Sequence, residues 1–141
     1  MTIITIDALL PHRGRMKLIE QIIETRDEAA VTAATVTAEW PLVEQNSVSP
    51  LVLIELVAQT SSIAIGWQKL QKNELIHSGG WLVGIKKARF MVEKIPLHTR
   101  ITTHAQVQLK IENYTVIKGV SKIGADVIAD IALQVIQSSD A

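Results

Sequence analysis

The spacing of apolar side chains marks one long helix in the middle of the chain. Residues 50–71 are apolar on nearly every turn, and a helix of that length would span roughly 30 Å. Ser49 suits the N-cap of this helix, and Pro50 suits its first position, where a missing N–H costs nothing. A shorter helix is expected over residues 5–10 and ends before Pro11.

Alternation of apolar and polar side chains, with a period of two, predicts strands on both sides of this helix. Before it, strands are expected at 15–24 and 29–38, followed by a loop over 40–49. After it, strands are expected at 81–93, 101–110, 114–122 and 127–135. In the last strand, one face is expected to carry Val127, Ala129, Ile131, Leu133 and Val135. One long helix followed by an antiparallel meander predicts an α+β fold, with the helix packed on one face of the sheet.

Composition narrows the class of protein without pointing to an activity. The 141 residues are 48% hydrophobic, which favours a single folded domain over residues 1–141 rather than disorder. The longest apolar stretch holds too many polar residues for a membrane span, and no signal peptide is apparent, so the cytoplasm is the expected compartment. A formal net charge of zero argues against non-specific binding of nucleic acid.

Metal and cofactor chemistry find little support in the sequence. The four histidines are scattered rather than spaced as metal ligands, and they are His12, His77, His98 and His104. There is no cysteine, no phosphate-binding glycine loop and no Gly-x-Ser-x-Gly motif. We therefore expect no metal ion and no cofactor.

One carboxylate interrupts the apolar surface of the long helix. Glu55 has Leu, Val, Ile and Ala around it, and in a helix that begins near Pro50 it falls in the second turn. Burying an ionised carboxylate is costly unless it is paired or neutralised, so Glu55 is a candidate general acid or base; the alternative is an edge position that reaches water. Gln59 lies four residues on, on the same face. Small side chains such as Ala58 and Ser62 would admit a ligand close to the helix, or only allow tight packing against the sheet.

Three segments, in order along the chain, resemble motifs of the 3-hydroxyacyl-acyl-carrier-protein dehydratases. Residues 9–13, Leu-Leu-Pro-His-Arg, are similar to the segment before the first strand of that family. Residues 52–59, which end in Glu-Leu-Val-Ala-Gln, are similar to its central-helix motif. Residues 84–90, Gly-Ile-Lys-Lys-Ala-Arg-Phe, are similar to a later strand motif. The likeness covers about residues 5–137 and resembles most a divergent branch, some members of which accompany aryl-polyene-type synthesis.

The resemblance implies a hotdog fold, in which a curved antiparallel sheet wraps a long helix, and a syn elimination of water from a 3-hydroxyacyl thioester. In the family a histidine removes the α-proton, and an acidic residue on the central helix handles the departing hydroxyl. By residue match, Glu55 takes the acidic role and Gln59 the polar position beside it. Acid and base come from different subunits, so the resemblance implies a homodimer or a larger assembly. Its substrate would be an acyl carrier protein or coenzyme A thioester.

The chain departs from the family at the positions of the base and of the oxyanion-binding N–H. The family's catalytic histidine, fourteen residues before the acid, is replaced by Pro41. The family's oxyanion glycine falls on Pro50, which has no N–H to donate, so Leu51 becomes the expected donor. His12 is the candidate replacement base, with a structural role as the alternative. The other side chains expected to line the substrate are Gln59, Ala58, Ser62, Gly84 and Ile85.

Basic residues close to these motifs form the expected docking surface for an acidic carrier protein, with ordinary solvated charge as the alternative. They are Arg13, Arg15, Lys86, Lys87 and Arg89. Opposite charge on the two partners would steer their docking.

Three functions remain open from the sequence. The first is a (3R)-3-hydroxyacyl-thioester dehydratase of fatty-acid-like or aryl-polyene-type biosynthesis, which the retained Glu55 and Gln59 favour. The second is a non-catalytic, acyl-binding hotdog subunit that pairs with an active paralogue, which the missing histidine favours. The third is a hotdog acyl thioesterase, in which Glu55 would activate water.

Overall fold

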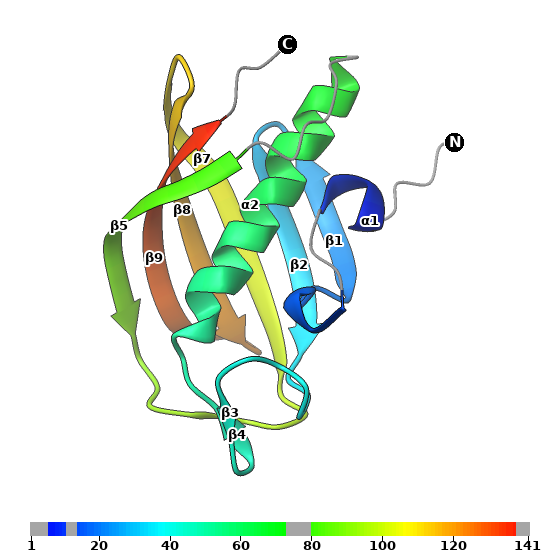
Figure 1. Ribbon diagram of the computed structural model, residues 1–141, viewed down its shortest axis with the longest axis vertical. Helices are drawn as coiled ribbons and strands as arrows, with labels where there is room; N and C mark the ends of the chain where they lie inside the picture. The colour runs from blue at the N-terminus through cyan, green and yellow to red at the C-terminus, as the bar shows by residue number, and fades with distance from the viewer. Residues whose placement is uncertain (1–5, 11–13, 73–79, 138–141) are drawn as a thin grey trace.

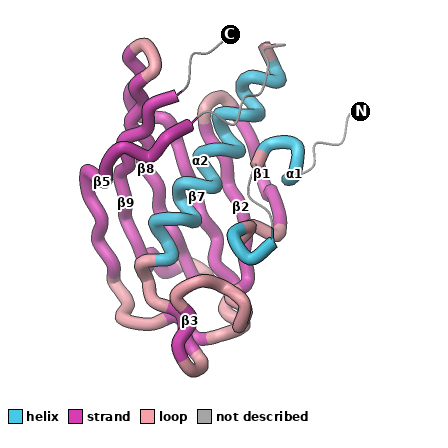
Figure 2. Tube along the Cα trace, viewed as in Figure 1, coloured by secondary structure: helices cyan, strands magenta, loops and turns pink. Residues whose placement is uncertain are grey.

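A long helix lies against a curved antiparallel sheet in the computed structural model, which describes residues 6–10, 14–72 and 80–137 (Figure 1). Two short segments come first, the helix α1 (Ile6–Leu9) and the 3-10 helix η1 (Gly14–Met16). The long helix α2 (Val52–Gln71) lies across the sheet, with α1 beside it (Figures 1 and 2). The predicted α+β fold, with one helix packed on one face of the sheet, is confirmed.

Six strands form the main sheet in the order β1-β2-β7-β8-β9-β5, and every neighbouring pair is antiparallel. Their bounds are β1 Gln21–Arg26, β2 Ala29–Thr35, β5 Gly80–Phe90, β7 Arg100–Ile111, β8 Tyr114–Ile123 and β9 Asp126–Gln137. A smaller sheet lies near the start of α2 and contains β3 Val43–Glu44, β4 Ser47–Val48 and β6 Ile95–Pro96 (Figure 1). β1 and β5 are therefore the two edge strands of the main sheet.

The period-two pattern predicted for 101–110 is confirmed along most of β7. Ile101, Thr103 and Ala105 are buried on the side of the sheet that faces α2, and the residues between them are more exposed. The pattern breaks between Val107 and Leu109, where the pairing with β8 shifts by one residue. Such a bulge turns the following side chains to the other face, so Leu109 is exposed rather than buried.

A second bulge changes the start of β9. The pairing of β8 with β9 shifts between Ser121 and Lys122, which inserts Ile128 into the β9 side of the ladder. Ile128 is therefore buried and Val127 is 41% exposed, so the prediction was wrong for Val127. The other residues predicted for that face are buried, and they are Ala129, Ile131, Leu133 and Val135.

Several predicted boundaries were also wrong. The first strand begins at Gln21 rather than at residue 15, because η1 occupies Gly14–Met16 and the Leu18 N–H donates to a side chain of α2. The segment predicted as a loop contains the short strands β3 and β4. The long helix begins at Val52, two residues later than predicted. The start of β1 and the pairing of β4 with β6 depend on residues far apart in the chain, whereas the later start of α2 follows from local bonds between residues 49 and 54.

Buried hydroxyl groups help to hold α2 on the sheet. Thr32 and Thr60 hydrogen-bond through their Oγ1 atoms at 2.8 Å, and Thr60 Oγ1 also donates to the Leu56 carbonyl at 2.7 Å. In the same row of the sheet, Thr103 Oγ1 and Ser121 Oγ lie 2.9 Å apart. Because each of these buried hydroxyls has a partner, the row fixes the position of the helix without leaving unpaired polar atoms in it.

α2 also approaches β8 very closely. A Cβ atom added at Gly119 would lie 2.3 Å from Val57 Cγ1, far inside van der Waals contact. Only glycine therefore permits this distance between helix and sheet. The close approach fixes the depth of α2, and with it the position of every side chain on the helix.

Candidate active site

Glu55 lies in the first turn of α2 and is half-buried. The prediction placed it in the second turn, which was wrong because the residues before Val52 form a tighter turn. There the N–H groups of Val52, Leu53 and Ile54 donate to carbonyls three residues earlier, at 3.1, 2.9 and 3.1 Å. A carboxylate in a first turn is stabilised by the positive end of the helix dipole.

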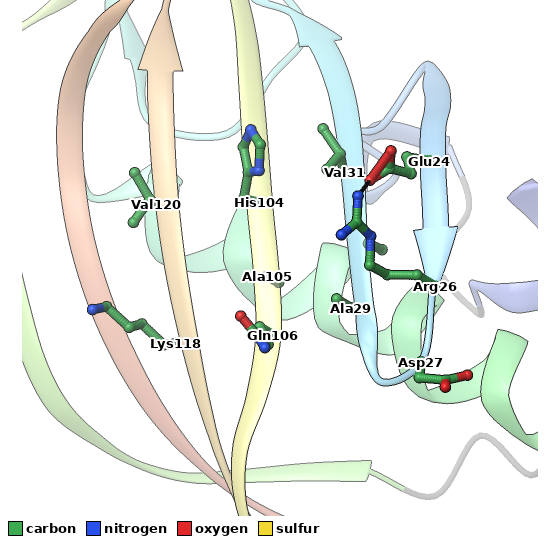
Figure 3. A pocket seen from close by; sticks show the side chains of 11 residues that line it. Glu24, Arg26, Asp27, Ala29, Val31, His104, Ala105, Gln106, Lys118 and Val120 are labelled. Atoms are coloured by element: carbon green, nitrogen blue, oxygen red, sulfur yellow. Dashed lines mark hydrogen bonds and ion pairs between the residues drawn. The ribbon is translucent and has the colours of Figure 1, made fainter.

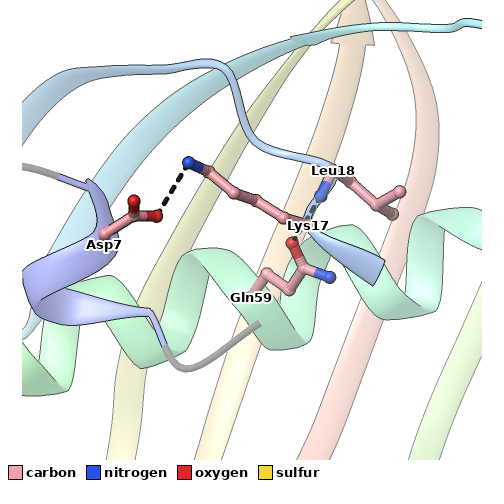
Figure 4. A network of polar contacts seen from close by, with 4 residues as sticks. All are labelled: Asp7, Lys17, Leu18 and Gln59. Carbon is pink, nitrogen blue, oxygen red and sulfur yellow. Dashed lines mark hydrogen bonds and ion pairs between the residues drawn. The ribbon is translucent and has the colours of Figure 1, made fainter. Parts of the chain in front are cut away.

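The Gln59 side chain fixes both Glu55 and the segment before β1. Its Nε2 donates to Glu55 Oε1 at 3.0 Å and to the Met16 carbonyl at 2.6 Å. Its Oε1 accepts the Leu18 N–H at 3.1 Å, and Lys17 between them pairs with Asp7 of the N-terminal helix at 2.8 Å (Figure 4). Gln59 is fully buried, and its bond with the Leu18 N–H is buried, whereas its bonds to Glu55 and Met16 are partly buried. The amide expected beside the acid is thus present and already occupied by protein groups.

A stripe of half-buried residues follows Glu55 along α2. Ile54, Ala58, Ser62 and Ile65 lie three or four residues apart, which places them on one face of the helix. Most other residues from Val52 to Gly66 are buried. Ser62 Oγ and Ser61 Oγ both donate to the Ala58 carbonyl, at 3.2 and 2.8 Å. Apart from Glu55, the stripe therefore offers small or apolar surface, as an acyl chain or a partner protein would require.

The N-terminal end of α2 has its N–H groups engaged. The Leu51 N–H, the expected donor to a thioester carbonyl, donates to Ser49 Oγ at 3.2 Å. Pro50 has no N–H, and its carbonyl accepts the Leu53 N–H. Leu51 occupies the N-cap position with helical dihedral angles, so Ser49, the predicted N-cap, lies two residues before the observed one. A substrate carbonyl at this end would have to replace the serine hydroxyl as the acceptor for Leu51.

The structure describes two of the four histidines, His98 and His104. His104 is exposed on the face of the sheet opposite α2, as its polar strand position predicted. His98 is exposed in the turn between β6 and β7, where its N–H donates to the Val36 carbonyl at 2.8 Å. His12, the candidate base, and His77 lie outside the described residues. Pro41, at the position expected for the family's histidine, is half-buried beside Trp40, which belongs to the hydrophobic core.

The basic residues are only partly described. Lys86, Lys87 and Arg89 are exposed on the edge strand β5, whereas Arg13 and the Arg15 side chain lie outside the described part. Lys87 Nζ lies 2.8 Å from Asp130 Oδ2 on β9. The hydrogen bond from Lys87, with the charges of Lys87, Lys118 and Arg89 nearby, lowers the pKa of Asp130. Cations of β5 and β8 are therefore concentrated around one carboxylate.

Gly84 and Ile85, also expected at the substrate, belong to the same strand. A Cβ at Gly84 would lie 2.6 Å from Gln134 Oε1, so the glycine leaves room for that side chain of β9. Ile85 is 50% exposed next to Lys86. These residues and the stripe on α2 come from different elements, and only a few contacts join α2 to β5.

A hollow of about 400 Å³ lies on the face of the sheet opposite α2 (Figure 3). Ala29 and Val31 lie at its centre, and longer side chains of the neighbouring strands surround them. The surrounding side chains include Glu24, Arg26, His104, Gln106 and Lys118. Glu55 is not part of this hollow, so the hollow and the candidate acid are separate features.

The described part of the chain contains neither a candidate metal site nor a membrane-spanning helix. Within residues 6–10, 14–72 and 80–137, no three histidine or acidic side chains are grouped so that they could hold a metal ion. In the same ranges, no helix is long and apolar enough to cross a membrane.

The arrangement of a long helix within a curved six-stranded antiparallel sheet defines the hotdog fold. The chain belongs to the ApeP-like family, described as ApeP dehydratase, whose match covers residues 4–141. The predicted kinship with hotdog-fold dehydratases is confirmed at this level. No curated protein sequence matches the chain significantly.

Solved structures share the fold at low sequence identity. The dehydratase heterocomplex ApeI:P from Xenorhabdus doucetiae is 22% identical with a TM-score of 0.88, covering 99% of this chain and 94% of that chain. The PaaI protein of the phenylacetic acid degradation operon of E. coli is 19% identical with a TM-score of 0.66, covering 83% and 82%. A hypothetical thioesterase with coenzyme A from Streptococcus pneumoniae is 12% identical with a TM-score of 0.65, covering 84% of each chain.

The sequence pointed to Glu55 and Gln59 but not to their surroundings. Nothing in the local pattern indicates that Gln59 binds the backbone of Met16 and Leu18, because these contacts join residues more than forty positions apart. The bond from the Leu51 N–H to Ser49 was within reach of sequence reasoning, since serine before a helix commonly accepts such a bond. The bonds of Gln59 join residues far apart in the sequence, whereas the bond between Leu51 and Ser49 joins residues two positions apart.

Proposed function

We propose that this chain supplies the acid of a two-subunit 3-hydroxyacyl-thioester dehydratase. One observation carries the proposal: Glu55 is half-buried in the first turn of α2 and is held by the Gln59 amide at 3.0 Å. A carboxylate with only a structural role would not need this hydrogen bond at the start of a stripe of small and apolar side chains. Membership of a dehydratase family supports the same reading.

The proposed reaction removes water from the Cα–Cβ bond of the acyl chain. A base takes the proton from Cα, the electrons of that C–H bond form the Cα=Cβ double bond, and the Cβ–O bond breaks. Protonated Glu55 gives its proton to the departing hydroxyl, which leaves as water. The proton on the base then returns to Glu55 through solvent. Gln59 acts as a positioning residue, because its amide is fully used by Glu55, Met16 and Leu18.

The base is proposed to come from a second chain. Of the histidines in the described part, His104 lies on the face of the sheet opposite α2, and His98 is exposed in the turn between β6 and β7. A similar hotdog structure is a dehydratase heterocomplex, which supports a different chain as the source of the base. The alternative is a homodimer, or a larger assembly of this chain, in which His12 of a second copy serves as the base.

The substrate is proposed to lie along the stripe of α2, with its thioester near Leu51 and its acyl chain beside Ala58 and Ser62. Gly84 and Ile85 would line it from the edge strand. Carriage by an acyl carrier protein would make use of the cations on β5, whereas a coenzyme A thioester is the alternative. A hypothetical thioesterase with coenzyme A shares the fold, which supports a thioester substrate.

The test compares the chain with its Glu55→Gln variant on a 3-hydroxyacyl pantetheine thioester. Each is assayed alone and with a histidine-bearing hotdog dehydratase subunit, by absorbance of the enoyl thioester. We expect turnover only in the mixture, and a loss of at least about 100-fold with Glu55→Gln, since a general acid contributes that much. Glu93→Gln, at an exposed loop position, is the matched control and should keep full activity.

Other outcomes would replace the proposal with one of its alternatives. Turnover by the chain alone that His12→Ala abolishes would favour the homodimer. Release of free thiol without an enoyl product would identify a thioesterase. No turnover in either preparation, with an acyl chain retained by the protein in mass spectrometry, would favour an acyl-binding subunit. An unchanged rate in Glu55→Gln would remove Glu55 from the mechanism.

A further inference from the structure

The hollow on the face of the sheet opposite α2 has the size of a small-molecule site. Its volume is about 400 Å³, and sites for small molecules have volumes of roughly 300–1,000 Å³. Ala29 and Val31 of β2 lie at its centre, where their short side chains leave space between the longer ones on either side (Figure 3). α2, which carries Glu55, packs on the other face of the sheet. A ligand in the hollow would therefore bind apart from the proposed reaction.

Three hydrogen-bonding side chains form one wall of the hollow. Gln106 of β7 pairs directly with Lys118 of β8, and His104 lies two residues before Gln106 on the same face of β7. The Cβ atoms of directly paired residues are roughly 5 Å apart, and those of diagonal neighbours such as His104 and Lys118 lie within roughly 8 Å. All three side chains are exposed, and none of them makes a hydrogen bond or an ion pair with a described residue. Each of them can therefore donate to the same group of a ligand.

The opposite wall of the hollow carries an ion pair rather than an isolated charge. Arg26 and Glu24 of β1 pair with each other there (Figure 3). Asp27, in the turn after β1, is the other acidic residue of the lining, and its side chain points away from Ala29 and Gln106. A negative group on the far side of the hollow would therefore meet little repulsion from β1.

Positive charge is concentrated beside the wall that offers the donors. Lys122 lies on the same face of β8 as Lys118, four residues further along the strand. Neither lysine forms an ion pair with a described residue. Asp130, on the neighbouring strand β9, responds to this charge: its hydrogen bond with Lys87 lowers its pKa most, and the charge of Lys118 lowers it further. Positive side chains around a concave site raise the local concentration of anions, so the hollow favours a negatively charged ligand.

We infer that the hollow is a second binding site, for a small molecule that has a phosphate group and an apolar body. The phosphate lies against His104, Gln106 and Lys118, and the apolar body lies over Ala29 and Val31. Three separate donors match the three free oxygens of a phosphate monoester, whereas a carboxylate has only two oxygens. The ammonium of Lys118 makes a charge-assisted hydrogen bond, which is stronger than one between neutral groups. The site does not include the candidate acid, so the inference goes beyond the proposed function.

The test compares two probes: phenyl phosphate, which has both parts, and inorganic phosphate, which has no apolar body. Binding to the full chain is measured by titration calorimetry and by the NMR signals of the His104 imidazole, which are assigned by their loss in His104→Gln. We expect phenyl phosphate to shift these signals and to bind at least about tenfold more tightly than inorganic phosphate, because its ring covers Ala29 and Val31. Lys118→Gln should weaken the binding of phenyl phosphate by about tenfold, since it removes the charged donor.

Two further variants separate the shape of the hollow from its charge. Ala29→Leu keeps every charge and fills the centre of the hollow, so it should remove most of the advantage of phenyl phosphate over inorganic phosphate. Lys94→Gln makes the same charge change as Lys118→Gln at an exposed position outside the hollow, and it should bind both probes as the wild type does. Urea unfolding midpoints verify that each variant is folded.

The inference is overturned if neither probe shifts the His104 signals, if the two probes bind the wild type equally well, or if Lys94→Gln weakens binding as much as Lys118→Gln. These measurements report binding to the face of the sheet opposite α2 rather than turnover. A failure of the proposed function would therefore leave them unchanged, and a failure of this inference would leave the role of Glu55 unchanged.

Discussion

Gln59 Nε2 donates to Glu55 Oε1 at 3.0 Å, one helical turn away on the same face of α2. The same nitrogen donates to the Met16 carbonyl, and the amide oxygen accepts the Leu18 N–H. The position of the candidate acid is therefore tied to a segment that precedes it by about forty residues. A change in this segment should therefore alter the position of Glu55, and a change at Gln59 should alter the stability of the fold.

Replacing Gln59 with leucine should destabilise the protein strongly. The substitution keeps most of the volume but leaves the buried Leu18 N–H and the partly buried Met16 carbonyl without their partner. Each unsatisfied buried group costs about 1–3 kcal/mol, so we expect a loss of about 2–4 kcal/mol in the free energy of unfolding, measured in urea. Gln106→Leu, at an exposed position, is the control and should change the free energy little. Equal stability of the two variants would contradict the bridging role of Gln59.

Two buried threonines should respond in opposite ways to valine. Thr115 Oγ1 is buried and has no hydrogen-bond partner, whereas Thr103 Oγ1 bonds to Ser121 Oγ at 2.9 Å. Thr115→Val removes an unsatisfied polar atom and should leave the free energy of unfolding unchanged or raise it by about 1 kcal/mol. Thr103→Val leaves the Ser121 hydroxyl without its partner and should lower the free energy of unfolding by about 1–2 kcal/mol. The urea unfolding midpoints of both variants decide the matter, and the reverse order would show that the hydroxyl at Thr115 has a partner.

Adding one methyl group at Gly119 should disturb the contact between α2 and β8. The new Cβ would overlap Val57, so Gly119→Ala should lower the free energy of unfolding by about 1–3 kcal/mol. Shortening the opposing side chain in the double variant Gly119→Ala/Val57→Ala should cost less than the sum of the two single changes. Thermal unfolding of the four proteins measures this coupling. If the effects of the two single changes add exactly, the side chain of Val57 is not what the missing side chain of Gly119 makes room for.

The ion pair between Lys87 and Asp130 should contribute stability only where Asp130 is ionised. The pKa of Asp130 is lowered from its ordinary value of 3.8 in the folded protein. A lowered carboxyl pKa stabilises the folded state above the unfolded value, and this contribution is lost as the pH falls through the folded value. Asp130→Asn should therefore reduce stability at neutral pH, by less than about 1 kcal/mol because the pair is exposed, and the gap should close below pH 3.8. Urea midpoints of both proteins from neutral to acid pH test this, and a gap that persists in acid would contradict it.

Local pattern was sufficient for the long helix and the six strands of the main sheet, but it missed η1, β3, β4 and β6. The apolar run that predicts the long helix, and the alternation that predicts the strands from Arg100 to Gln137, are periodic over many residues, so single exceptions do not hide them. The pattern failed at Leu109 and Val127, because a bulge inserts one residue and reverses which face a side chain occupies. Bulges leave no mark on hydrophobic spacing until the partner strand is known.

The sequence by itself determined the class of fold, the dehydratase kinship and the pair of polar residues on the central helix, because each depends on residues near one another in the chain. Only the tertiary structure decided what Gln59 holds, that the Leu51 N–H is engaged, and that the cations of β5 stand on an unpaired edge. These features depend on which distant segments meet. Long-range packing brings those segments together, and the spacing of side chains along the chain does not predict which segments pack.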